Sequence, residues 1–184
     1  MPRYALDPAA PTLPGIAVAP ILPTSQANRG RAWEDQIEAQ HALYRLRGWR
    51  MQRQYVRVLI QEGGRAAKVI GTAPPDWWFG KGGRWGEVDL KDWRGAGRWP
   101  LDQVAPHLAA SFDLTLDAGG IAGIVLRYQG AGWWLPWGEV GPRWRAWSGT
   151  FGRAAAGSAS LGPQELMEVG ERFEGADWLP VAIR

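Results

Sequence analysis

Trp85-Gly86-Glu87-Val88-Asp89-Leu90-Lys91 is the stretch of sequence that decides the fold. Its side chains alternate as in a β-strand, which places Val88 and Leu90 on one face. The other face carries three charged side chains, Glu87, Asp89 and Lys91. We therefore expect a strand that packs its apolar face against a core and presents a charged cluster on the opposite face.

A second carboxylate, Asp76, precedes this strand, and the Gly-rich residues 79–84 lie between the two acidic segments. Such a turn predicts a β-hairpin that brings Asp76 and Asp89 together. Converging carboxylates repel each other unless a cation lies between them, and such oxygen ligands suit Mg²⁺ or Mn²⁺. Lys91 is expected to face the same site.

Length and composition limit the class of protein. The 184 residues suffice for one well-buried domain, or for one domain with arms, and the absence of cysteine excludes disulfides and thiolate metal sites. No apolar run is long enough for a membrane span, and no signal peptide is recognisable, so we expect a soluble cytoplasmic protein without a membrane partner. The net charge is +3 and most cations are Arg, which favours an anionic polymer as partner. The thirteen Trp are expected mainly in packing, with stacking on bases as the alternative.

Residues 1–27 are rich in proline and are expected to form an extended arm, which precedes a domain spanning 28–184. A disordered tail is the alternative to an arm that becomes ordered on a partner subunit or on DNA.

A helix is predicted over residues 28–47. One apolar stripe holds Trp33, Ile37 and Tyr44, and the next holds Ala39, Leu43 and Leu46. The opposite side, at its border with the first stripe, carries Glu34, Glu38, His41 and Arg45. Glu34 could point toward the carboxylate pair, or the charged side could simply be a solvated face with i,i+4 pairs. His41 is not expected to bind a metal.

A basic hairpin is predicted next, from extended residues 49–60 and a returning strand over 66–70. The hairpin, about 54–72, and its base carry four cations, Arg53, Arg57, Arg65 and Lys68. It could contact a DNA backbone or junction, or it could be an edge hairpin whose charges prevent aggregation.

The remaining chain alternates helices and strands. We expect a helix over 102–116, a strand buried on both faces over 121–128, a strand over 133–137, a loop over 141–162, a short helix over 163–170 and an extended tail over 177–183.

This order of elements resembles the PD-(D/E)xK nuclease superfamily and, within it, the RecU-type Holliday-junction resolvases. In the first half, the matching residues are Asn28, Arg29, Gly30, Trp33, Glu34, Asp35, Tyr44, Gly48, Asp76, Asp89, Leu90 and Lys91. In the second half they are Trp99, Pro100, Leu101, Val104, His107, Gly119, Gly120, Ile121, residues 166–170, Asp177, Trp178 and Leu179. The sequence departs from the family in having Asp89 where Glu is usual, Leu108 where Gln is usual, Pro74 and Pro75 before Asp76, and a shorter hairpin.

The resemblance implies an α/β, restriction-endonuclease-like fold, in which a mixed central sheet is flanked by helices and a basic β-hairpin protrudes. It also implies a homodimer with two active sites that nicks four-way junction DNA symmetrically.

The resemblance assigns roles to residues as well. Asp76 and Asp89 would bind Mg²⁺ or Mn²⁺, with Glu34 as a third ligand directly or through water, and Lys91 would orient the attacking water or stabilise the phosphate. The residues expected to contact DNA are Arg57, Arg65 and Lys68 of the basic hairpin, together with Arg29, which is among the residues that match the family. Glu87 is a candidate for supporting the metal site.

Three alternatives remain open from the residues alone. The chain could be another nuclease of the same superfamily that cuts branched or linear duplex. It could be a nucleic-acid-binding module without enzymatic activity that uses Arg and Trp. The acidic residues could also be an ordinary surface carboxylate cluster.

Overall fold

The computed structural model describes residues 27–55, 58–60, 67–69, 71–95, 97–148 and 160–184, with backbone only for 27–31, 58–60 and 67–69. Its centre is a six-stranded mixed sheet in the order β1-β4-β5-β7-β8-β10. The strands are β1 (Arg50–Arg53), β4 (Trp77–Lys81), β5 (Arg84–Trp93), β7 (Ile121–Tyr128), β8 (Ala131–Pro136) and β10 (Glu171–Phe173). The predicted α/β class with a mixed sheet flanked by helices is confirmed.

The β4–β5 hairpin forms as predicted. Gly82 and Gly83 make its two-residue turn with φ of +57° and +83°, a backbone conformation that glycine adopts without strain. In the antiparallel register Trp77 lies opposite Val88. Asp76 and Asp89 are the next residues on each side, so the turn brings the two carboxylate-bearing positions face to face.

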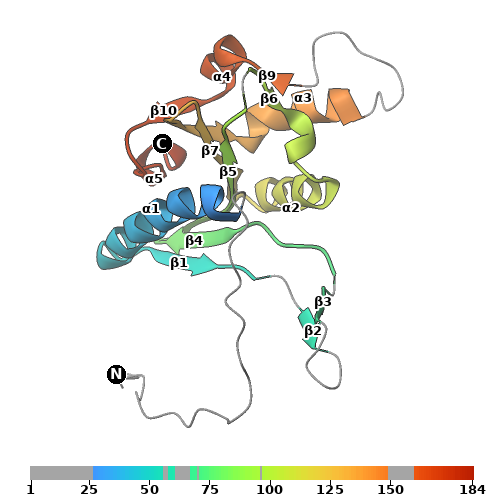
Figure 1. Cartoon of the computed structure of the whole chain (residues 1–184). Coiled ribbons are helices and arrows are strands. Elements are labelled where there is room, and N and C mark those ends of the chain that lie inside the picture. Colours follow the sequence, from blue (N-terminus) through green and yellow to red (C-terminus); the bar gives the residue numbers. More distant parts are fainter. Residues whose placement is uncertain (1–26, 56–57, 61–66, 70, 96, 149–159) are drawn as a thin grey trace, which may run out of the picture.

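Helix α2 (Pro106–Asp117) connects β5 to β7, and these two strands are parallel. Figure 1 shows α1 (Ala27–Leu46) and α2 on different sides of the central strands. Ile124 belongs to the core beneath α2, whereas its neighbour Val125 belongs to the core beneath α1. Strand β7 is therefore buried on both faces, as its continuous apolar sequence predicted.

Helix α1 agrees with the predicted helix to within one residue at each end. Its stripe of Trp33, Ile37 and Tyr44 is buried, as expected. The second apolar stripe does not belong to the core, because Leu43 is 47% exposed and Leu46 is 84% exposed. The sheet covers only one side of the helix, so a second apolar stripe finds nothing to pack against.

The expected extended segment 49–60 is divided between two sheets. Residues 50–53 form β1 at the edge of the main sheet, whereas β2 (Val58–Ile60) pairs only with β3 (Ala67–Val69). This two-stranded ribbon lies apart from the main sheet (Figure 1). Arg53 was wrongly associated with the hairpin, because it lies in β1.

Two predictions in the C-terminal third were wrong. Helix α3 (Trp137–Ser148) occupies part of the expected loop, and the short helix α5 (Leu179–Ala182) lies in the expected extended tail. Gly141 and Pro142 disfavour a helix in the sequence, but Trp137 and Val140 are buried in the core, and this packing outweighs the low propensity. The expected helix at 102–116 also begins later, since residues 101–103 form a 3₁₀ turn, η1 (Leu101–Gln103).

The other elements agree with the sequence predictions within about the usual boundary error. Helix α4 (Pro163–Val169) is present, and β8 ends one residue before the predicted strand end. The short strands β6 (Trp99–Pro100) and β9 (Ser160–Leu161) pair with each other, and Trp99 and Leu161 are buried in the core beneath α2. No helix in the described ranges is long and apolar enough to cross a membrane. The proposed arm, except for residue 27, lies outside the described residues.

Candidate metal and catalytic site

Asp76 is held at the base of the β4–β5 hairpin by two backbone contacts. Its Oδ2 accepts a hydrogen bond of 2.8 Å from the backbone N–H of Leu90, and its carbonyl accepts one of 2.8 Å from the N–H of Gln54. The first bond crosses from β4 to β5, directly beside Asp89. The carboxylate of Asp76 is thereby fixed at the end of the strand that carries the acidic-x-Lys triplet.

Asp89 and Lys91 form a close ion pair on β5. The distance between Lys91 Nζ and Asp89 Oδ2 is 2.6 Å, and the side chains are 25% and 6% exposed, respectively. Asp89 Oδ2 is completely buried and accepts no well-directed hydrogen bond from the described residues. The ammonium group thus lies against the carboxylate without satisfying it fully, which leaves an oxygen with capacity for a further cation.

The electrostatics of Asp76 show that these groups act on one another. Burial and the nearby charge of Asp89 raise the pKa of Asp76 to about 6, and the charge of Glu34 adds to this rise. The Leu90 N–H and the charge of Lys91 act in the opposite direction. The charges of Asp89, Lys91 and Glu34 therefore all act on the Asp76 carboxyl, and Asp76, Asp89 and Lys91 are called the carboxylate cluster below.

Glu34 lies on helix α1 and acts on Asp76 through its charge. Its Oε2 accepts a hydrogen bond of 2.9 Å from Arg53 at the end of β1, and its side chain is 47% exposed. Within the described ranges, no three His, Cys, Asp or Glu side chains lie close enough to hold a metal ion together. Asp76 and Asp89 alone nevertheless fit Mg²⁺, which is usually held by one or two carboxylates and keeps several waters. Glu34 as a ligand through water stays a prediction.

Glu87 shares the face of Asp89 but has partners of its own. Its Oε2 accepts hydrogen bonds from Ser111 (2.8 Å) and Thr115 (3.0 Å) of α2. These hydrogen bonds connect α2 to β5, the strand that carries Asp89 and Lys91.

No protein-family model and no curated protein matches the sequence.

The four residues predicted to bind DNA are not described at the level of their side chains. Arg29 and Lys68 lie in elements described by their backbone only, and Arg57 and Arg65 lie outside the described residues. Their contacts with DNA stay predictions.

His41 was wrongly placed on the charged side of α1. It is fully buried, and its Nε2 accepts a hydrogen bond of 3.0 Å from Nε1 of Trp178. Burial, with a smaller contribution from the charge of Arg45, lowers the pKa of His41 to about 3. The signal was present in the sequence, because position 41 lies four residues after Ile37 and three before Tyr44, the spacing of one buried helical stripe.

A group that sequence reasoning missed follows the triplet directly. Asp92 accepts hydrogen bonds from Arg127 Nε (2.8 Å) and Nη2 (2.6 Å) on β7, and from Arg94 Nε (2.8 Å). Arg127 in turn lies over the ring of Trp33, with its guanidinium carbon 4.9 Å from the ring centroid. Nothing in the local sequence indicates that Arg127 and Trp33 belong here, because they come from elements far away in the chain.

Proposed function

We propose that this protein is a divalent-metal-dependent endodeoxyribonuclease that nicks four-way DNA junctions. The observation that carries the proposal is the cluster of Asp76, Asp89 and Lys91 at the end of the β4–β5 hairpin. Two mutually repelling carboxylates beside a lysine are costly to maintain in a partly buried position, and a surface cluster would gain nothing from that arrangement.

Asp76 and Asp89 are the residues that would hold Mg²⁺ or Mn²⁺. The bound cation would supply a water of lowered pKa and neutralise charge at the phosphate. Lys91 lies beside Asp89 and can donate hydrogen bonds to a phosphate oxygen, where it stabilises the charge that develops in the transition state. Glu34, whose charge acts on Asp76 from α1, can orient a water at the same position.

The order of elements supports this assignment. Helix α1 is followed by the antiparallel strands β1, β4 and β5, then by α2 and by β7 parallel to β5. This is the order implied by the resemblance to the PD-(D/E)xK nucleases.

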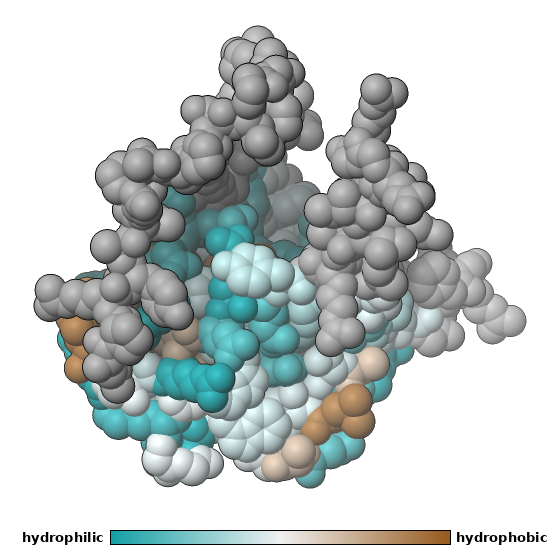
Figure 2. Space-filling view, turned by 90° about the horizontal axis from the view of Figure 1, so that it is seen from below, coloured by the Kyte–Doolittle hydropathy of each residue, from teal (hydrophilic) through white to brown (hydrophobic). Residues whose placement is uncertain are grey.

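A polar partner such as a nucleic acid suits the molecular surface. The described part of the face seen in Figure 2 is mainly hydrophilic, and hydrophobic residues occur on it only in small separate groups. The proposed preference for four-way junctions and the proposed homodimer both rest on the resemblance to the RecU-type resolvases. A homodimer also suits the chemistry, because opposed nicks on a two-fold symmetric junction require two sites related by a matching axis.

Strand cleavage tests the proposal. The protein is incubated with a labelled four-way junction and with a linear duplex of the same arm sequence, in Mg²⁺ and in EDTA. We expect Mg²⁺-dependent nicks at symmetric positions on the junction and much slower cleavage of the duplex. Equal cleavage of both substrates would support nuclease activity but refute the proposed preference for four-way junctions. No cleavage of any DNA with Mg²⁺ or Mn²⁺ would refute the proposed activity.

A further inference from the structure

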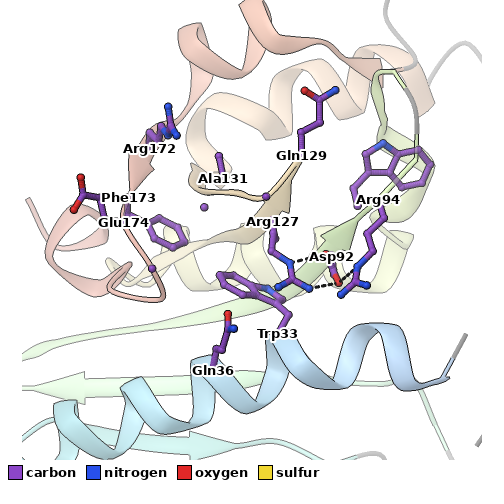
Figure 3. A pocket seen from close by; sticks show the side chains of 14 residues that line it. Trp33, Gln36, Asp92, Arg94, Arg127, Gln129, Ala131, Arg172, Phe173 and Glu174 are labelled. Carbon is purple, nitrogen blue, oxygen red and sulfur yellow. Dashed lines mark hydrogen bonds and ion pairs between the residues drawn. The ribbon is translucent and has the colours of Figure 1, made fainter. Parts of the chain in front are cut away.

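A cleft of about 1030 Å³ opens at the carboxyl ends of β5 and β7. In Figure 3, α1 forms one wall, and the β7–β8 turn and β10 form the opposite side. The polar and aromatic residues that define it are Trp33, Gln36, Arg94, Arg127, Gln129 and Arg172. Clefts at the carboxyl ends of parallel strands are common ligand sites.

The group of Asp92, Arg94 and Arg127 described above forms part of the cleft wall and gives it a fixed cationic character. Figure 3 shows Arg127 and Arg94 reaching the same carboxylate from two sides. Burial acts to raise the pKa of Asp92, but the two guanidinium groups outweigh it and hold the pKa below its ordinary value. Asp92 therefore stays ionised and keeps both arginines in place.

The cleft offers more donors than acceptors. Its charged residues are three arginines against Asp92 and Glu174, which leaves a net charge of +1, and Arg94 and Arg127 are both paired with Asp92. A ligand that suits such a lining carries negative charge and several acceptor oxygens, as a phosphodiester does.

The position of the cleft relates this ligand to the cluster. Asp92 and Trp93 follow Lys91 directly, and Trp33 precedes Glu34. Side chains alternate along β5, so Asp92 lies on the face toward α1, with Arg127 and Trp33, whereas Asp89 and Lys91 lie on the opposite face with Glu87, which bonds α2. A DNA strand that contacts both groups must therefore pass around the carboxyl end of β5.

We infer that this cleft binds the phosphate backbone of the DNA strand that continues from the phosphate at the Asp76–Asp89 cluster. The inference rests on the proposed nuclease function and assigns that function a second DNA contact. Free nucleotides share the same phosphate chemistry, so the experiment includes a dinucleotide as competitor.

Salt titrations of DNA binding, measured by fluorescence anisotropy in EDTA, test the cleft without requiring cleavage. Arg172→Gln and the double variant Arg94→Gln/Arg172→Gln are compared with the wild type on a four-way junction. Each lost phosphate contact should reduce the salt slope by about one unit. Affinity should fall on the order of tenfold per contact, the scale of a charge-assisted hydrogen bond.

Arg84→Gln is the matched control, because Arg84 begins β5 at the end of the strand remote from the cleft. Ten residues of strand place it about 30 Å from the end of β5. The control should bind DNA as the wild type does. Equal losses in the control and in the cleft variants would overturn the inference, as would unchanged slopes in the cleft variants. Displacement of DNA by equimolar dinucleotide would assign the cleft to free nucleotides instead and would also overturn it.

The absence of cysteine in this chain allows a second, positional measurement. An iron–EDTA group is attached through a single introduced thiol, in Gln36→Cys at the cleft or in Leu46→Cys, which is exposed about 15 Å further along α1. Hydroxyl radicals from the label at position 36 should cut bound DNA within a few nucleotides of the enzymatic nick, and those from the label at position 46 should cut weakly. Absent cutting from position 36, or stronger cutting from position 46, would contradict the inference even where the arginine variants lose affinity.

The two proposals fail differently. If the wild type cuts no DNA with Mg²⁺ but the cleft variants lose salt-dependent binding, the nuclease proposal fails and the DNA contact stands. If the wild type cuts junctions and the cleft variants bind with wild-type slope and affinity, only the cleft is refuted.

Discussion

A buried histidine at the centre of the α1 core makes stability depend on pH. The unfolded chain binds a proton at His41 below about pH 6.5, whereas the folded protein binds it only below about 3. Between these values the unfolded state holds the extra proton. The free energy of unfolding should therefore fall with decreasing pH in this window, by up to about 1.4 kcal/mol per pH unit from this group.

We predict that His41→Gln lowers the slope of stability against pH by up to about 1.4 kcal/mol per pH unit relative to the wild type, while Asp76, whose raised pKa of about 6 gives a slope of opposite sign, contributes equally in both proteins. The Gln side chain can still accept the hydrogen bond from Trp178 but does not titrate. The measurement is urea unfolding between pH 6.5 and 4.5 for the wild type, His41→Gln and the control His107→Gln. The control should keep the wild-type slope. If His41→Gln also kept it, the pH dependence would have to arise from other groups.

The same residue shows where sequence reasoning fails at this scale. The proximity of Asp76, Asp89 and Lys91 could be predicted, because the turn and the strand alternation are local patterns. The partners of His41 and Asp92 could not, because Trp178 and Arg127 lie far away in the chain and only the fold brings them near.

At the scale of elements, the contact between β5 and β7 depends on a glycine. A Cβ added to Gly86 would overlap the backbone carbonyl of Ile121 and lie 2.6 Å from Cζ of Phe79. The neighbouring atoms belong to β7 and to the core beneath α1, so neither can move freely. The close approach of the two parallel strands holds β5, which carries Asp89 and Lys91, against β7.

We predict that Gly86→Ala destabilises the fold by about 1–3 kcal/mol through overpacking. For a chain of this size each kcal/mol corresponds to a decrease of roughly 2–4 °C in Tm. Gly138→Ala in α3 is the control, because a Cβ there meets no atom within 4 Å. Calorimetry should give a lower Tm for the first variant and an unchanged or slightly higher one for the second. Equal Tm values for the wild type and both variants would contradict this prediction, because β7 would then accommodate the added methyl group without loss of stability.

Elements differed in how far the sequence could predict them. The β4–β5 hairpin and β7 follow from a Gly-Gly turn, side-chain alternation and a continuous apolar run. Helix α3 could not be predicted in this way, because Gly141 and Pro142 disfavour a helix. The packing of Trp137 and Trp144 against the core stabilises this helix. The division of residues 49–60 between two sheets likewise depends on pairing with β4, which the segment itself does not encode.

At the scale of the whole molecule, the junction proposal requires two copies of the site. A C₂ homodimer is the simplest way to present two clusters to opposed strands of a four-way junction. We predict that sedimentation velocity at micromolar concentration, without DNA, gives a dimer. A monomer under these conditions would argue against symmetric resolution, although it would leave metal-dependent cleavage of single strands intact.

The central claim is that Asp76 and Asp89 form a metal-dependent catalytic site, and cleavage by Asp89→Asn tests it most directly. The substitution keeps the shape of the side chain but removes the charge that a cation requires. Asp102→Asn is the control, because Asp102 is exposed and its only side-chain hydrogen bond among the described residues is to Gln103.

The measurement is the single-turnover rate of junction nicking in Mg²⁺, together with junction binding in EDTA, for the wild type and both variants. We predict that Asp89→Asn loses at least about 100-fold in rate, the scale of one transition-state interaction, while it binds the junction as the wild type does. Asp102→Asn should match the wild type in both assays. A nicking rate for Asp89→Asn equal to that of the wild type would contradict the assignment of the catalytic site to this cluster.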